Sequence, residues 1–151
     1  MTATEKTTAT PTATTIGWLK FACIVTGGFG LLMVLAASPV TAAPASFLLD
    51  LVFWPIDGSE TTEAHEFRLV AAILGGVMVG WAVLFWQIVT RLYPRDPRLA
   101  RQMITWSILS WFVLDSTGSI IAGAPLNAVF NIGFLALFLL PLRQRQQTPP
   151  A

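Results

Sequence analysis

Long apolar stretches separated by short polar ones dominate the chain. Four of them reach the roughly 20 residues that a helix needs to cross a bilayer: residues 16–37, 67–91, 103–122 and 125–142. None alternates polar and apolar residues as the strands of a membrane barrel do, and backbone groups in lipid must be satisfied within the segment. The pattern predicts an all-α integral membrane protein, a four-helix transmembrane bundle.

Three further segments depart from this pattern. Residues 45–55 are apolar but too short to span a bilayer, and predict an extra helix lying in the interface between spans 1 and 2. Asp57, with Glu60 three residues later, has the spacing of a helix cap, which predicts that the next helix begins in water. Residues 1–15 and 143–151 lack any apolar period and predict disordered cytoplasmic tails.

Composition narrows the class of protein. The chain is 54% hydrophobic and only 11% charged, whereas about a quarter of the residues in a soluble domain are charged. A net charge of +1 with no gathered basic surface argues against nucleic acid as a partner. The single cysteine, Cys23, cannot form an internal disulfide and is expected to be a buried small hydrophobe. The lipid bilayer is therefore the first predicted partner.

The basic residues predict the orientation, because Lys and Arg are retained on the cytoplasmic side of a membrane. The connection between the first two spans is acidic, with Arg68 as the nearby cation. The other eight basic residues fall on the opposite side: Lys6, Lys20, Arg91, Arg95, Arg98, Arg101, Arg143 and Arg145. The sequence predicts an integral protein of a bacterial inner membrane with both termini in the cytoplasm.

A secretory signal is the alternative interpretation of the first span. Lys20, an apolar run and the small residues "AASPVTAA" follow in the order of a cleavable signal. Cleavage would remove residues 1–43 and leave three spans. The long threonine-rich leader is unusual for a signal, and the first span completes the charge asymmetry, so we favour four spans.

Small residues predict where helices approach closely, because lipid tails do not drive helices together by the hydrophobic effect. Ala72, Gly76 and Gly80 follow one another at four-residue steps in the second span. We expect them to form an internal packing surface, with a homodimer face as the alternative.

Four tryptophans fall at similar depths when the second and third spans fold about their connection. They predict packing inside the bundle or, as the alternative, an aromatic-walled pocket for an apolar ligand. The four are Trp81, Trp86, Trp106 and Trp111.

Polar side chains interrupt the third and fourth spans at matching depths. Folding these spans about Gly123 places Asp115 eight residues before the turn and Asn131 eight after it. Ser119 and Asn127 each lie four residues from the same turn. The spacing predicts two polar layers that face one another across the hairpin.

Asp115 is the costliest of these groups, since a charge at the centre of a membrane helix is disfavoured by about 2.5 to 3.5 kcal/mol. We expect it to be paired, hydrogen-bonded or protonated, and Arg68, near the outer end of the second span, is the expected cation. Further hydrogen bonds would come from its neighbours: Ser116, Thr117, Ser119, Asn127 and Asn131. This network either fixes the fold, or holds a protonatable or substrate-binding carboxylate in a cavity that is open to the outside, or contacts a partner protein.

No motif indicates catalysis, a cofactor or a metal. The second polar cluster consists of Glu63, His65 and Glu66. It has only one histidine and lacks the spacing of metal ligands, so we expect it to be the solvated acidic start of a helix. We find no motif that assigns the chain to a family. The sequence predicts a non-enzymatic membrane protein that binds or helps translocate a small or lipid-like ligand as a homo-oligomer. The alternative is an accessory or assembly subunit of a larger membrane complex.

Overall fold

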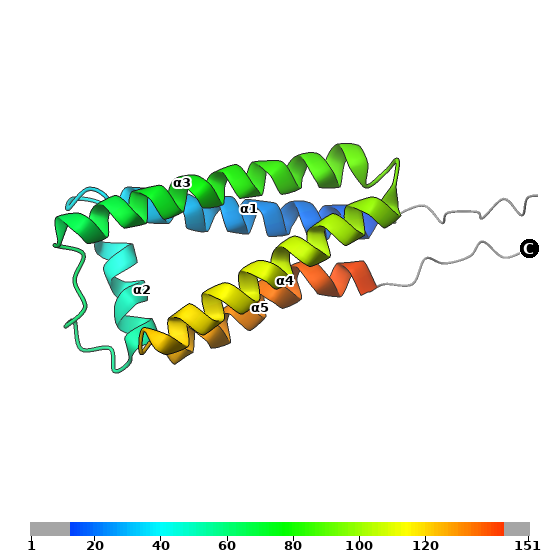
Figure 1. The fold of residues 1–151 in the computed structure, drawn as a ribbon. Coiled ribbons are helices and arrows are strands. Elements are labelled where there is room, and N and C mark those ends of the chain that lie inside the picture. The colour runs from blue at the N-terminus through cyan, green and yellow to red at the C-terminus, as the bar shows by residue number, and fades with distance from the viewer. Residues whose placement is uncertain (1–12, 144–151) are drawn as a thin grey trace, which may run out of the picture.

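Four long helices and one short helix make up most of residues 13–143, the part of the chain that the computed structural model describes (Figure 1). A π-helical turn, η1, continues the third helix directly. In chain order the elements are α1 (Ala13–Leu35), α2 (Ala43–Phe53), α3 (His65–Gln87), η1 (Ile88–Leu92), α4 (Pro97–Ile121) and α5 (Pro125–Arg143).

The predicted all-helical architecture is confirmed. The long helices α1, α3 with η1, α4 and α5 are each long and apolar enough to cross a membrane. The short helix α2 occupies the place predicted for the extra helix between the first two spans. The predicted tails lie outside the described residues, apart from residues 13–15, which begin α1, and Arg143, which ends α5.

Two helix starts differ from the sequence prediction. Helix α4 begins six residues before residue 103, because the Asp96 side chain accepts a hydrogen bond from the Leu99 N–H at 2.9 Å and Pro97 occupies the first turn. An apolar run in the sequence marks only the segment of a helix that can lie in lipid, whereas the capping residue determines the residue at which the helix begins. Asp57 caps no helix: it accepts the Ser59 N–H within the loop, and α3 starts only at His65.

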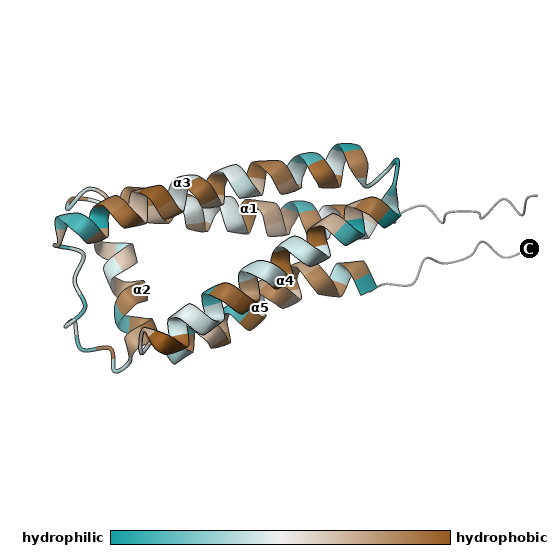
Figure 2. Ribbon diagram, viewed as in Figure 1, coloured by the Kyte–Doolittle hydropathy of each residue, from teal (hydrophilic) through white to brown (hydrophobic). Residues whose placement is uncertain are grey.

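The long helices form two antiparallel pairs. Helix α1 packs along α3, and α4 packs along α5. The pairs meet near the start of α1 and the end of α5 and spread apart toward the opposite end, where α2 crosses between them (Figure 1). Hydrophilic residues gather at the two ends of the molecule, with a further hydrophilic patch inside α4 and α5 (Figure 2).

Helices α1 and α3 approach each other closely at Gly30 of α1 and Gly75 of α3. A Cβ atom added at Gly75 would overlap the carbonyl oxygen of Gly30 and lie 2.7 Å from the backbone nitrogen of Val34. A Cβ atom at Gly30 would lie 2.9 Å from the carbonyl oxygen of Gly75. Glycine at both positions lets the two backbones touch.

The internal packing surface predicted at Ala72, Gly76 and Gly80 is therefore wrong, while the homodimer face stays a prediction. A Cβ atom at Gly76 or Gly80 would have no atom within 4 Å, and both glycines are exposed, while Ala72 is half-buried. Because a helix has 3.6 residues per turn, each four-residue step overshoots by about 40°. The buried face of α3 instead alternates steps of four and three residues: Ala71, Gly75, Met78, Ala82 and Phe85.

Aromatic side chains from all four long helices cross the interior of the bundle. Each ring centroid lies between 4.9 and 5.9 Å from the next, which is the range of favourable aromatic pairs. In order the rings are Phe29, Phe134, Trp111, Trp81, Phe85 and Phe138. This aromatic row joins the two helix pairs. Cys23 is buried near it in α1, as predicted.

Candidate functional site

A cluster of five polar side chains, which we call the hairpin cluster, lies between α4 and α5. The Asp115 Oδ2 atom accepts hydrogen bonds from Asn127 Nδ2 at 3.1 Å and from Asn131 Nδ2 at 2.6 Å. Asn127 Nδ2 also donates to Ser119 Oγ at 2.8 Å, and Asn131 Nδ2 to Ser116 Oγ at 3.1 Å. The two polar layers predicted from depth are thus in contact across the hairpin.

Local geometry places these side chains. Gly123, with a positive φ of 83°, allows the tight turn between the helices, and Pro125 occupies the first turn of α5, where it removes no intrahelical hydrogen bond. Ser119 Oγ donates back to the carbonyl oxygen of Asp115 at 2.7 Å, which leaves its lone pairs free for Asn127. Asn131 is only 4% exposed.

Arg68 does not join the hairpin cluster, so the predicted ion pair with Asp115 is wrong. Arg68 Nε donates to the carbonyl oxygen of Thr62 at 2.9 Å instead. The reason lies in the fold: Arg68 stands at the start of α3, where the two helix pairs are farthest apart (Figure 1). The amide groups of Asn127 and Asn131 take the place of the expected cation.

Thr117, another expected contributor, lies exposed on α4, and no hydrogen bond ties its side chain to the cluster among residues 13–143. The hairpin cluster forms its contacts within one helix pair. Its geometry fits a structural role, because the donors of both amides point at acceptors on the facing helix.

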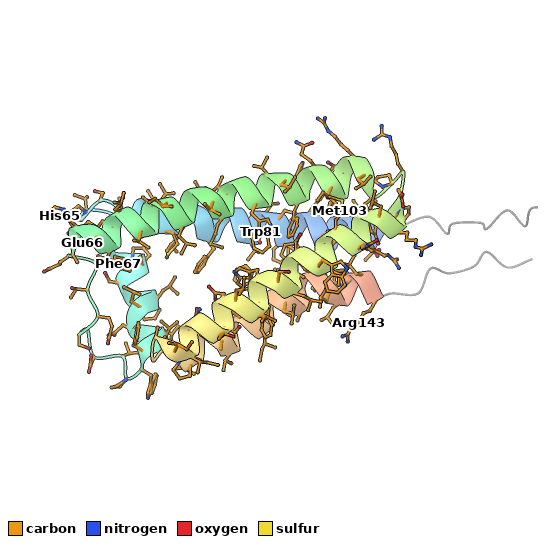
Figure 3. All side chains as sticks on the ribbon, viewed as in Figure 1. His65, Glu66, Phe67, Trp81, Met103 and Arg143 are labelled. Carbon is orange, nitrogen blue, oxygen red and sulfur yellow. The ribbon has the colours of Figure 1, made fainter. Side chains whose placement is uncertain are left out.

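Arg68 belongs to a second polar site, a cavity of about 410 Å³ that we call the α2 pocket. It is bounded by α2, the loop that follows it and the first turn of α3. Its lining residues are Pro39, Ala42, Ala43, Ser46, Phe47, Asp50, Gly58, Glu60, Thr61, Thr62, Glu63 and Arg68. The pocket lies at the same end of the molecule as His65 and Glu66, away from Arg143 (Figure 3).

Polar contacts hold the walls of the α2 pocket together. The hydroxyl groups of Ser46 and Thr62 lie 3.2 Å apart and join α2 to the loop. Asp50, only 5% exposed, accepts the Gly58 N–H at 2.9 and 3.1 Å on its two carboxylate oxygens. Together with the Arg68 bond to Thr62, these contacts fix the loop against both helices.

The α2 pocket carries charges of both signs. The Arg68 guanidinium uses Nε for Thr62, and its two terminal nitrogens have no partner among the described residues. Asp50, Glu60 and Glu63 line the same cavity, and Glu63 is exposed. Three carboxylates against one guanidinium leave the lining with an excess of negative charge.

The loop carboxylates form a tight group that the sequence does not predict. Oxygens of Asp50, Asp57 and Glu60 lie within 4.8 Å of one another. Hydrogen bonds to Gly58 and Ser59 account for all three. Bonding from the side chain and backbone of Ser59 lowers the pKa of Asp57, so this contact is kept at neutral pH and lost in acid.

Asp50 is the residue of this site that sequence reasoning misses. A lone aspartate in an apolar helix, followed by the Asp57-Gly58 pair, is the signal that points to it. An aspartate in such a helix needs a donor, and a glycine turn supplies an exposed N–H.

Of the tryptophans proposed as pocket walls, Trp81 and Trp111 meet inside the bundle, at 5.9 Å between centroids, where Trp81 lies between α3 and α4 (Figure 3). Trp106 is 65% exposed and Trp86 is 36% exposed, so both face away from this contact. The alternative interpretation, a pocket walled by all four tryptophans, is therefore wrong. Bundle packing is right for Trp81 and Trp111.

Comparisons with known protein families, with curated proteins and with solved structures found no match to this chain.

Proposed function

We propose that this protein is a multi-pass membrane protein that binds a small ligand in the α2 pocket. The ligand class is a zwitterion that carries a phosphate or carboxylate group close to an amino group. The observation that carries the proposal is the lining of the cavity, which combines the free terminal nitrogens of Arg68 with an excess of carboxylates.

Each half of such a ligand has a matching group in the pocket. Arg68 presents two guanidinium nitrogens, which suit the oxygens of a phosphate or carboxylate. Glu63 and Glu60 can accept hydrogen bonds from an ammonium group, and Thr61, a further lining residue, offers a hydroxyl. A purely anionic ligand would be repelled by the carboxylates, and a simple cation would leave Arg68 without a partner.

Phosphoethanolamine chemistry fits this description, and it occurs both in free metabolites and in lipid headgroups. Exposed apolar residues lie on α2 and on the segments that flank it: Val40, Phe47, Phe53, Trp54 and Ile56. They suit the membrane interface, where lipid headgroups lie. We propose binding alone, without translocation, because the aromatic row packs across the bundle interior beyond the pocket.

The proposal places the α2 pocket outside the cytoplasmic membrane of a bacterium, with both termini inside. The acidic loop at one end and the arginines at the other support this orientation. The predicted accessory subunit role is the second candidate, and it would use the exposed face at Gly76 and Gly80, which no described element covers.

Cysteine labelling tests the orientation. In a Cys23→Ala background, Ser59→Cys and Arg98→Cys each place one thiol at an exposed position, at opposite ends of the molecule. We expect a membrane-impermeant maleimide to label the Ser59→Cys protein in intact spheroplasts, and the Arg98→Cys protein only after permeabilisation. Labelling of Arg98→Cys in intact spheroplasts would reverse the orientation.

Thermal unfolding in detergent tests the ligand class. We expect sn-glycero-3-phosphoethanolamine, at a hundredfold excess over Kd, to add about 2.7 kcal/mol of stability, which corresponds to a Tm higher by about 5 to 10 °C. Glycerol 3-phosphate and ethanolamine each offer only one of the two charged groups and should shift the Tm much less. Equal shifts with all three compounds would contradict the proposal.

Two matched variants locate the binding. Glu63→Gln removes a pocket carboxylate that makes no hydrogen bond in the described structure, so it should abolish most of the Tm shift without changing the ligand-free Tm. Glu66→Gln, three residues later and outside the lining, should keep the full shift. Unfolding in nanodiscs then distinguishes the two sources of the ligand. If the pocket binds a lipid headgroup, nanodiscs of phosphatidylethanolamine should stabilise the protein and nanodiscs of phosphatidylglycerol should not. If it binds a free solute, the two kinds of nanodisc should give the same stability.

A further inference from the structure

The surface of the α1–α3 pair carries a second cavity, far from the α2 pocket. This groove of about 220 Å³ is lined by Cys23, Ile24, Gly27, Leu31, Val79, Ala82, Val83 and Trp86. None of these side chains is charged, and Ile24, Leu31 and Val83 are exposed. Gly27 and Ala82 form its floor, where a Cβ atom added at Gly27 would lie 3.5 Å from Cβ of Ala82.

A single cation stands at one end of this groove. The Lys20 Nζ atom lies 5.6 Å from the centroid of the Trp86 ring, within the range of a cation–π contact. Lys20 is half-buried on the same stripe of α1 as Ile24, Gly27 and Leu31. No carboxylate or hydrogen-bond acceptor meets its ammonium group within residues 13–143.

We infer that this groove binds one acyl chain of an anionic phospholipid, whose phosphate group contacts Lys20. The indole face of Trp86 holds the ammonium group from one side, which leaves N–H donors for phosphate oxygens. Charge complementarity selects the headgroup, because an ammonium group without a carboxylate partner inside an apolar segment is costly. Because Gly27 and Ala82 are small residues, the groove is deep enough for an acyl chain to lie between α1 and α3.

The dimensions fit one leaflet. Lys20 and Leu31 are eleven residues apart, which at a rise of about 1.5 Å per residue is about 16 Å along the helix axis. Half of a hydrocarbon core of about 30 Å is about 15 Å. The arginines of the α3–α4 connection lie at the same end as Lys20, and their charge attracts anionic lipid to that surface (Figure 1).

Native mass spectrometry from mild detergent tests this inference. The purified full chain is incubated with equal amounts of phosphatidylglycerol and phosphatidylcholine that have identical acyl chains. We expect the protein to retain phosphatidylglycerol about fivefold over phosphatidylcholine, which is the effect of one basic residue at an anionic surface. Lys20→Gln should bring the ratio close to one, and Lys20→Arg should restore it.

Two further variants separate the groove from general surface charge. Arg91→Gln removes an equal charge from the same end of the molecule and should leave the preference intact. Gly27→Leu fills the groove and should lower the retention of both lipids, with helix content checked by circular dichroism. An unchanged ratio in Lys20→Gln, or loss of preference in Arg91→Gln, would overturn the inference, as would unchanged lipid retention in Gly27→Leu. The groove shares no lining residue with the α2 pocket, so this lipid experiment can fail or succeed independently of ligand binding in the α2 pocket.

Discussion

Gly75→Ala is expected to destabilise the protein by about 2 to 3 kcal/mol, the upper range for overpacking a tight interface. The new methyl group would overlap the carbonyl oxygen of Gly30 and crowd the backbone nitrogen of Val34. Both are backbone atoms and cannot rotate away, so α1 and α3 must move apart. Reversible unfolding in SDS, or steric trapping in bicelles, measures the loss.

The adjacent glycine is the control. Gly76→Ala adds the same methyl group where no atom lies within 4 Å, and alanine favours helix over glycine by about 1 kcal/mol or less in a lipid-facing helix. We expect this variant to be as stable as the parent or slightly more stable. Equal stability of the two variants would contradict a backbone contact between α1 and α3 at Gly30 and Gly75.

Asp115→Leu is expected to cost about 2 kcal/mol, because it leaves two amide groups without their acceptor. Asn131 suffers most, since it is almost fully buried and keeps only Ser116. Asn127 keeps Ser119. The same unfolding assays apply, and the loss should appear whether or not a ligand is present.

Asp115→Asn separates hydrogen bonding from other effects of the substitution. Its amide oxygen can accept from both Asn127 and Asn131, so we expect a loss of about 1 kcal/mol or less. Thr117→Leu, two residues along the same helix and exposed, should change stability by no more than about 0.5 kcal/mol. Equal losses for the leucine and asparagine variants of Asp115 would show that the hairpin cluster does not depend on this acceptor.

The sequence predicts contacts that depend on local geometry. Asp115 and Asn131 could be paired by counting residues from Gly123, because a short turn between two helices fixes which positions lie at equal depth. The long helices could be placed by apolar length, since each hydrophobic run must fit a similar thickness. Both predictions need only the spacing within one hairpin.

Contacts between the helix pairs could not be predicted in this way. Pairing Arg68 with Asp115 requires α3 and α4 to lie side by side at that end, whereas the two helix pairs spread apart there. Arg68 instead donates to Thr62 in the loop after α2. The α2 pocket depends on that loop, whose path follows from Asp50 and Gly58 rather than from any periodicity. Successive residues of a helix point in directions about 100° apart. To predict that Gly75 rather than Gly76 contacts α1, one must therefore know how α3 is rotated about its axis, which the sequence does not show.

The short sequence distance between the partners of the hairpin cluster bears on how the chain enters a membrane. Asp115 leaves the ribosome before its amide partners, but Asn127 and Asn131 follow only 12 and 16 residues later. A single helix carrying Asp115 would meet lipid with an unpaired carboxyl group, whereas the hairpin of α4 and α5 brings its own donors. Under the proposed membrane placement, we therefore expect α4 and α5 to insert together, with their polar groups joined before either helix faces lipid alone.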